Sequence, residues 1–369
     1  MKKFFLFLML FFILALPAHA EPVYDAADAI SAEGQAAMEE IVENFSFRDA
    51  ARGLSEGTDS GFLHTLWQGL VRFVFGEARN SLSVPLTIAG LAVLCSLLGN
   101  LGGEKSVSEV AFFLAYATCI GLASAAVGDA AELARRAAQD MSTFTGAAMP
   151  ALAVLSVSAG SPSAAALHPA LLSTAAAASL LLNRVGIPAL YISLALSVVG
   201  NLSNRSPLRT LSAVVRKTAL WIVCGSLTLF SAVISVTGYA AGTLDGVTAK
   251  GIKYAASSLV PVLGGILSES AEAVSLSALT IKNAAGAAGM LLLLLLTLYP
   301  VIKTIITSLL YRLAAAVASP AADGRICTAL SDMADMLSAL AGMTAATGVL
   351  SMLTVGMLTR LTDIGVMLR

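Results

Sequence analysis

The chain has 369 residues, of which 57% are hydrophobic and only 12% are charged, and its net charge is −1 at pH 7. Soluble domains carry about 25% charged residues, so this deficit excludes an ordinary soluble protein and indicates an all-α polytopic membrane protein. The balanced charge also excludes the basic surface that is typical of nucleic-acid-binding proteins.

Residues 1–20 have the pattern of a cleavable secretory signal peptide. Lys2 and Lys3 form a positive start, and an apolar core of 13 residues runs from Phe4 to Leu16. This core is shorter than the roughly 20 residues that cross a bilayer. We expect a mature chain that begins outside the cytoplasm, and an uncleaved membrane anchor is the alternative interpretation.

Residues 21–81 are the most polar part and form a second, extracytoplasmic segment. Apolar residues recur at helical spacing from Phe62 to Val74. This spacing predicts an amphipathic helix on the membrane surface, with Trp67 at the level of the headgroups. An ordinary packed helix would produce the same spacing.

Residues 82–369 form a polytopic helical membrane domain, in which about 6–8 segments are expected to cross the bilayer. Their residue numbers are 83–101, 107–128, 144–159, 164–182, 186–202, 218–241, 287–310 and 334–358. Residues 144–182 are expected to form a hairpin that either crosses twice or only dips into the membrane. The two apolar pieces between Leu259 and Ile281 are too short to cross and predict a re-entrant hairpin.

The loop after residues 186–202 gives the expected orientation, because it has four positive residues and no acid, which is typical of a cytoplasmic loop. The four residues are Arg205, Arg209, Arg216 and Lys217.

A slide of the chain by about 111 residues aligns two similar halves, over about 106–216 and 217–330. Pro150 then falls on Pro261, and Pro188 falls within one residue of Pro300. Each half reads as a span, an outer helical segment, a hairpin led by proline and a span that contains proline. Both halves begin after a short charged inner loop, so the pattern indicates a parallel internal repeat.

Glu269 and Glu272 are the residues whose role is most open. They lie three residues apart and so share one face of a helix. Catalysis would need a pocket that gives the two carboxylates separate acid and base roles, and the sequence provides no sign of one. An ion or solute path and a polar rim at the membrane surface are the other two interpretations.

Charged residues next to the apolar segments are further candidates for a path or a docking surface. Arg184 follows Asn183 at the end of one segment, and Lys282 with Asn283 precedes another. Long side chains at such positions are expected to snorkel to the interface. Lys303 lies deeper, where it either lines a pore or snorkels.

Small residues and prolines complete the candidates. Gly264 and Gly265, which follow Pro261, allow helices to approach closely or allow a break in the helix. His168 and Pro169 begin the motif "HPALL".

The motifs of common enzymes and cofactor sites are absent from the sequence. The three histidines are far apart, and the four cysteines form no CxxC pair. We therefore predict no enzymatic activity, no catalytic residue, no metal and no cofactor.

Residues Thr243 to Gly286, "TLDGVTAKGIKYAASSLVPVLGGILSESAEAVSLSALTIKNAAG", resemble the core of the stage III sporulation protein AE family. The shared features are an Asp-Gly turn, "PVLG" and a polar helix that ends in "KN". The motif "HPALL" with the later Pro188, the signal peptide and the final arginine resemble the family as well, so the similarity covers nearly the whole chain.

The resemblance implies a membrane subunit of the channel complex, similar to a feeding tube or a secretion system, that connects the mother cell to the engulfed forespore. It implies a location in the mother-cell membrane around the forespore. The implied partners are other proteins of the same operon, including ring-forming and secretion-ATPase-like subunits, and a forespore partner complex. A stand-alone solute permease and a non-conducting membrane scaffold are the alternatives.

Overall fold

The computed structural model describes residues 71–367, apart from 73, 102–104, 160, 162, 203–205, 260–262 and 321. Every element in this described part is a helix, which confirms the all-α class. The predicted signal peptide and most of the predicted amphipathic segment lie outside the described residues.

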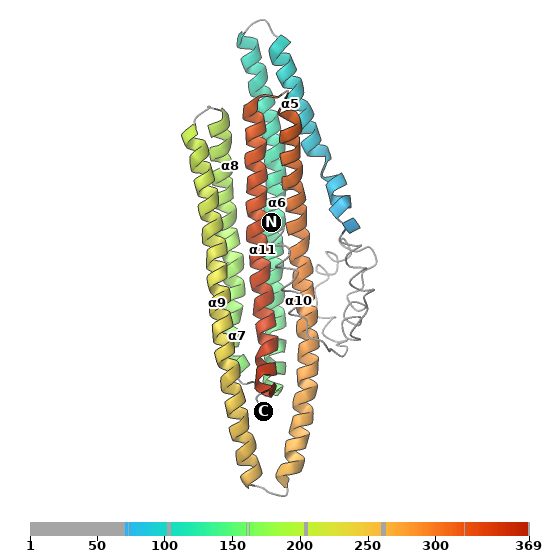
Figure 1. Cartoon of the computed structure of the whole chain (residues 1–369), viewed down its shortest axis with the longest axis vertical. Coiled ribbons are helices and arrows are strands. Elements are labelled where there is room, and N and C mark those ends of the chain that lie inside the picture. The colour runs from blue at the N-terminus through green and yellow to red at the C-terminus, as the bar shows by residue number, and fades with distance from the viewer. Residues whose placement is uncertain are drawn as a thin grey trace.

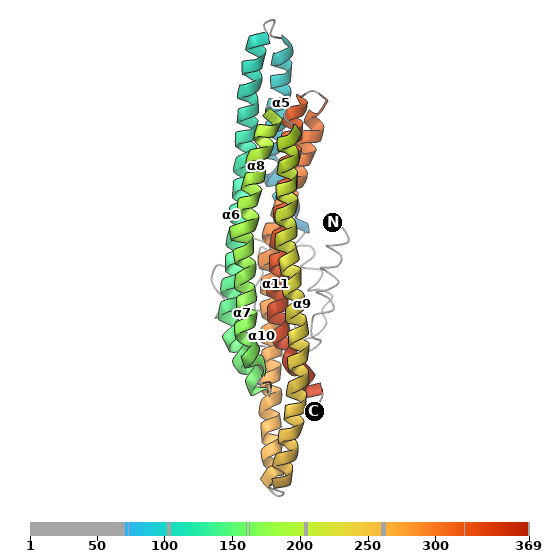
Figure 2. The same cartoon turned by 90° about the vertical axis from the view of Figure 1, so that its left-hand side faces the viewer.

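The helices run up and down a single elongated bundle (Figures 1 and 2). In chain order they are α5 (Ser83–Leu101), α6 (Lys105–Ser158), α7 (Ser163–Leu181), the π-helix η1 (Leu182–Gly186), α8 (Ile187–Leu202), α9 (Ser206–Leu259), α10 (Leu263–Ala318) and α11 (Gly324–Met367). Helices α7, η1 and α8 follow one another without a turn and form one rod. A helix rises about 1.5 Å per residue, so the 54 residues of α6 or α9 span about 80 Å, far more than the roughly 30 Å of a hydrocarbon core.

Five described helical runs are long and apolar enough to cross a membrane, which agrees with a polytopic membrane protein. They are Tyr116–Ser158, Pro169–Asn201, Pro207–Val236, Ser277–Ala318 and Gly324–Thr359. Some of the expected spans are therefore parts of one helix: residues 107–128 join 144–159 in α6, and residues 164–182 join 186–202 in the α7–α8 rod.

The charged stretch within α6 does not interrupt the helix, because its charges pair along the same helix. The Glu132 carboxylate accepts from Arg135 at 2.7 Å and from Arg136 at 2.8 Å, three and four residues further on. Such pairs stabilise a helix. The sequence pattern suggested a boundary here because hydropathy alone does not register this pairing.

The re-entrant break predicted at Gly264 and Gly265 is wrong. Helix α10 is continuous from Leu263 to Ala318, so both glycines lie in its first turn. The change of direction falls between the end of α9 and the start of α10. The short apolar pieces do not need to turn back inside the bilayer, because the helices continue well beyond its thickness.

Two long hairpins stand in parallel, and both turn at the same end of the bundle (Figure 1). One is α6 with the α7–α8 rod, and the other is α9 with α10. Their first helices begin at 105 and 206 and end at 158 and 259, an offset of 101 residues at both ends. The parallel arrangement agrees with the predicted repeat, and the bounds of these helices give an offset of 101 residues where the sequence slide gave about 111.

Helix α11 is the centre of the bundle and lies between α9 and α10 (Figure 1). In the most apolar window of α11, 72% of the residues are buried, against 22% in that of α9. Helix α9 instead exposes a row of large apolar side chains that includes Leu211, Trp221 and Val236. Exposed apolar rows of this kind are expected to face lipid.

Close helix approach in the centre depends on glycine. A Cβ atom added at Gly348 of α11 would lie 2.1 Å from Oγ1 of Thr297 on α10. One added at Gly238 of α9 would lie 2.0 Å from Cε of Met357 on α11. Small residues of this kind bring membrane helices close enough to pack backbone against side chain.

Candidate functional site

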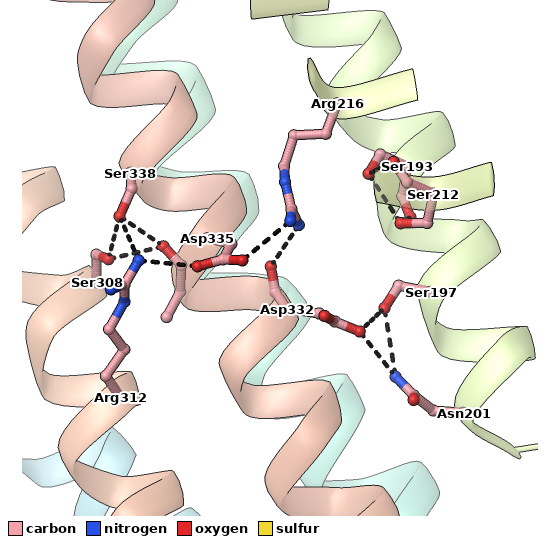
Figure 3. A network of polar contacts seen from close by, with 11 residues as sticks. Ser193, Ser197, Asn201, Ser212, Arg216, Ser308, Arg312, Asp332, Asp335 and Ser338 are labelled. Atoms are coloured by element: carbon pink, nitrogen blue, oxygen red, sulfur yellow. Dashed lines mark hydrogen bonds and ion pairs between the residues drawn. The ribbon is translucent and has the colours of Figure 1, made fainter. Parts of the chain in front are cut away.

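Polar side chains from four helices meet near one end of α11 (Figure 3). We call them the polar cluster. Its members are Ser197 and Asn201 of α8, Arg216 of α9, Ser308 and Arg312 of α10, and Asp332, Asp335 and Ser338 of α11. The four helices are all candidate membrane spans in whole or in part. Ionisable residues inside such helices are costly and usually have a function.

Asp335 lies between two arginines that come from opposite sides of α11. Its Oδ2 accepts from Nη2 of Arg216 at 2.9 Å, and its Oδ1 accepts from Nη2 of Arg312 at 2.8 Å. The Arg216 side chain is only 11% exposed, whereas Arg312 is 46% exposed. The contact with Arg216 is the less exposed of the two, although the Asp335 side chain itself is 44% exposed. One carboxylate thus ties both α9 and α10 to α11.

Asp332 ties α8 to the same helix. Its Oδ2 accepts from Oγ of Ser197 at 2.6 Å and from Nδ2 of Asn201 at 3.1 Å. Both donors are buried. Arg216 also donates to the main-chain oxygen of Asp332 at 3.3 Å, which links this contact to the one at Asp335.

Serine hydroxyls extend the cluster to the neighbouring helix pairs. Ser193 of α8 and Ser212 of α9 donate to each other's main-chain oxygens at 3.0 and 2.7 Å. Ser308 of α10 donates to the main-chain oxygen of Ala334 at 2.7 Å, and its Oγ lies 2.8 Å from that of Ser338. Hydroxyl contacts of this kind hold membrane helices together.

The sequence places these side chains on single helix faces. Ser193, Ser197 and Asn201 recur every four residues on α8, and Asp332 and Asp335 are three residues apart on α11. Residues three or four apart are neighbours on a helix surface. Each helix therefore contributes a polar stripe, and the stripes meet because α11 is central.

Asp332 and Asp335 were missed by the sequence prediction. The last span was expected to cover residues 334–358, so Asp332 fell just before it and Asp335 at its first turn, and neither acid was named as a candidate. The available signal was two acids three residues apart within a long apolar stretch, which is a recognised mark of a functional membrane helix. Arg216 was noted only as a positive charge of the cytoplasmic loop.

Lys282 does not snorkel to an interface, contrary to the prediction. Its side chain is fully buried and donates to the main-chain oxygen of Thr359 on α11. Asn283, the next residue, is half-buried. Lys282 is therefore a contact between α10 and α11, because a buried ammonium needs an acceptor.

Lys303 contacts residues of two helical segments. Its Nζ lies 3.7 Å from Oε1 of Glu77, 3.4 Å from the Tyr299 hydroxyl and 5.5 Å from the centre of that ring. Beside it, Ile302 and Ile306 pack with Val74. Lys303 thus helps to hold the segment before α5 against α10.

Asn183 and Arg184 lie in the π-helix, which interrupts the hydrogen-bond pattern between α7 and α8. Arg184 is exposed, as a snorkelling residue would be. Asn183 donates to Oγ of Ser179 at 3.3 Å, while its Oδ1 is buried without a partner in the described part. Gly186 ends the π-helix, where an added Cβ would lie 2.9 Å from Sδ of Met343.

The remaining predicted site residues lie along other parts of the helices, so the structure does not gather the predicted set into one site. Pro169 is exposed near the start of α7. Glu269 and Glu272 are in the first third of α10, and His168 is in α7, but their side chains lie outside the described residues. Pro261 lies outside them as well.

The sequence model of the stage III sporulation protein AE family matches residues 45–362. The chain belongs to this family. Its membrane-spanning helices and this membership together make it a membrane protein of sporulation.

A relative from Bacillus subtilis (strain 168), stage III sporulation protein AE, is 30% identical over 233 residues. The match covers 62% of this chain and 58% of the relative, so it spans a little more than half of that protein. No solved structure matches the chain. Neither the family description nor the relative's name states a chemical reaction.

Proposed function

We propose that this chain is an integral membrane subunit of the complex that joins the mother cell to the forespore, and that it forms part of the membrane platform or conduit of that channel. The observation that supports this most is its membership of the sporulation family over residues 45–362. The same proposal includes residence in the mother-cell membrane around the forespore.

The geometry supports a platform that holds other subunits. The polar cluster connects four helices, and each of its two carboxylates is engaged by side chains of neighbouring helices. Such cross-links fix the positions of helices relative to one another. A rigid bundle of rods longer than the bilayer offers surfaces on both sides of a membrane, and we propose that this role needs no enzymatic activity.

The proposed partners are the other proteins of the same operon, including ring-forming and secretion-ATPase-like subunits, and a forespore partner complex. These partners would meet the chain on opposite sides of the membrane. The parts of the helices that extend beyond the hydrocarbon core are the surfaces available to them.

The test uses the organism that encodes the chain, with its own gene replaced by a fluorescent fusion. We expect the fusion to gather in the membrane around the forespore, to be recovered with the operon proteins after cross-linking, and to support a late forespore reporter. Asp335→Ala is expected to lose reporter activity, whereas Ser331→Ala, an exposed serine bonded within its own helix, is expected to keep it.

Two outcomes would contradict the proposal. One is normal late forespore expression after deletion of the gene. The other is a functional fusion that spreads evenly over all membranes and recovers none of the operon proteins.

A further inference from the structure

Helix α6 carries a row of polar and small side chains on the surface of the bundle, which we call the α6 face. Its members, three or four residues apart, are Asp129, Glu132, Arg136, Gln139, Thr143 and Ala147. A Cβ atom added at Gly128 or Gly146, near the two ends of this row, would meet no atom of the described part within 4 Å. The described helices therefore leave the row uncovered.

The α6 face is charged where a lipid-facing helix would be apolar. No large apolar side chain is exposed on α6 between Leu122 and Val154, a stretch that the structure describes in full. The side chains of Glu132, Arg135 and Arg136 are instead 40%, 46% and 70% exposed.

Helix α9 has the opposite character. It carries no charged residue between Lys217 and Asp245. In the same part it exposes large apolar side chains, including those of Trp221, Leu229 and Val233. The two helices both pack on α11, which lies between them (Figure 2). The bundle thus has an apolar side and a charged side.

Contacts between the helices place these two sides at the same depth. The Thr297 hydroxyl of α10 donates to Sδ of Met141 on α6 at 3.7 Å, and the same oxygen lies at the close approach to Gly348 of α11. Gly342, six residues before Gly348, faces Leu220 of α9. Helices α6, α9 and α11 run in the same direction (Figure 1), so Met141 is level with the position about six residues after Leu220.

This depth is inside the membrane wherever α9 crosses it. The α9 run Pro207–Val236 has 30 residues, and a hydrocarbon core takes about 20 of them. Every stretch of about 20 residues within the run includes 217–226, which is level with about 132–141 on α6. The charged part of the α6 face therefore lies at the depth of the hydrocarbon core.

Water suits this face better than lipid or another protein. Exposed charges are costly in lipid, so charges at this depth face protein or water. Glu132 already accepts from Arg135 and Arg136 of its own helix, so the face needs no opposite charge from a partner. The other N–H groups of both arginines still need acceptors, which water provides. A protein contact would be expected to bury large apolar or aromatic side chains, and the α6 face contains none.

We propose that the α6 face lines a water-filled path across the membrane, while α9 faces lipid. From Asp129 to Ala147 the face rises by about 27 Å, close to the roughly 30 Å of a hydrocarbon core. One helix face forms only one wall of a path. The inference therefore deepens the proposed function and rests on it, because further subunits of the complex would complete the path.

The first experiment measures how fast a charged, water-soluble thiosulfonate reagent modifies single cysteines, in membranes prepared from sporulating cells of the organism that encodes the chain. The four native cysteines are first replaced by alanine. Thr143→Cys and Ala147→Cys report on the α6 face, and Leu229→Cys and Val233→Cys are exposed controls at about the same two depths on α9. We expect the α6 cysteines to react at least about tenfold faster, because the reactive thiolate forms in water.

Equal rates on the two helices would overturn the proposal. It would also be overturned if Gln139→Cys reacts quickly while Ala147→Cys is as slow as the α9 controls, because the charges would then only reach the headgroups. The same strains are scored for late forespore expression. Slow α6 cysteines in a strain that keeps this expression overturn the inference alone, whereas normal expression after deletion of the gene overturns the proposed function.

A second experiment does not depend on access of a reagent. Thr143→Lys and Leu229→Lys place the same side chain at about the same depth on the two helices. We expect Thr143→Lys to reach the wild-type amount in the membrane and Leu229→Lys to fall by about fivefold or more, because lysine inside lipid is costly. Equal amounts of the two variants would contradict the assignment of water to α6 and lipid to α9.

Discussion

The two ends of the bundle are built differently. At the end where α10 passes into α11, side chains of four helices cross-link through Asp332 and Asp335. At the other end, the α9–α10 hairpin extends beyond the other described helices. The comparison teaches that polar contacts between side chains fix the relative positions of four helices at the first end.

Loss of the central carboxylate should have the largest effect. Asp335→Ala would remove two hydrogen bonds between charged groups, one of them to the mostly buried Arg216, and we expect a loss of about 3 kcal/mol in the free energy of unfolding. The measurement is unfolding in mixed micelles as the SDS fraction rises. Arg312→Ala removes only the exposed partner and should cost less than about 1 kcal/mol. Equal losses of unfolding free energy in the two variants would show that the Arg216–Asp335 pair does not stabilise the protein more than the exposed Arg312–Asp335 pair.

The link between α8 and α11 should come next. Ser197→Ala removes the 2.6 Å donor to Asp332, and hydrogen bonds to charged groups contribute about 1.5–3 kcal/mol, so we expect a loss of about 2 kcal/mol. Ser331→Ala is the matched control, because this exposed hydroxyl donates to Cys327 in its own helix. If the two serine variants unfold at the same SDS fraction, the Asp332 contact does not hold α8.

Close packing along α11 should have a smaller effect. Gly348→Ala would place a Cβ atom 2.1 Å from Oγ1 of Thr297, and this overpacking should cost about 1–2 kcal/mol. Gly342→Ala is the control on the same helix, because its added atom would meet Leu220 at an ordinary 3.7 Å. The same SDS titration measures both. If Gly348→Ala unfolds at the same SDS fraction as the wild type, the close approach of α10 to α11 at Thr297 does not contribute to stability.

The smallest effect is expected at the start of α10, where a substitution should raise the stability of the helix instead of lowering it. Gly264 lies in the first turn of a continuous α10, so Gly264→Ala should stabilise the helix by about 0.5–1 kcal/mol. Circular dichroism of the purified chain should show equal or greater helix content. A loss of helix content would instead support the break that the sequence pattern suggested at this position.

The class of the fold was predictable because composition and apolar length are properties of the sequence alone. The boundaries were not, because hydropathy treats the charges between Glu132 and Arg136 as a gap, while the helix pairs them internally. Prolines were also poor markers, since Pro150 and Pro300 both lie inside helices. In membrane helices neighbouring groups can compensate for the missing hydrogen bond.

The polar cluster could not be predicted as a site, although each helix shows its own polar stripe. Arg216 and Asp335 are separated by 119 residues, and Ser197 and Asp332 by 135. Only the central position of α11 brings these stripes together.

The length of the rods has a mechanical consequence. Helices α9 and α10 pass the polar cluster and run to the far end of their hairpin, and each helix is about 80 Å long. The part of each rod between the cluster and the far end is about 65–75 Å long. A tilt of about 5° at the cluster therefore moves the far end sideways by about 6 Å, slightly more than the height of one helical turn. A small change of the arginine contacts at Asp335 would therefore produce a much larger shift at the far end of the α9–α10 hairpin.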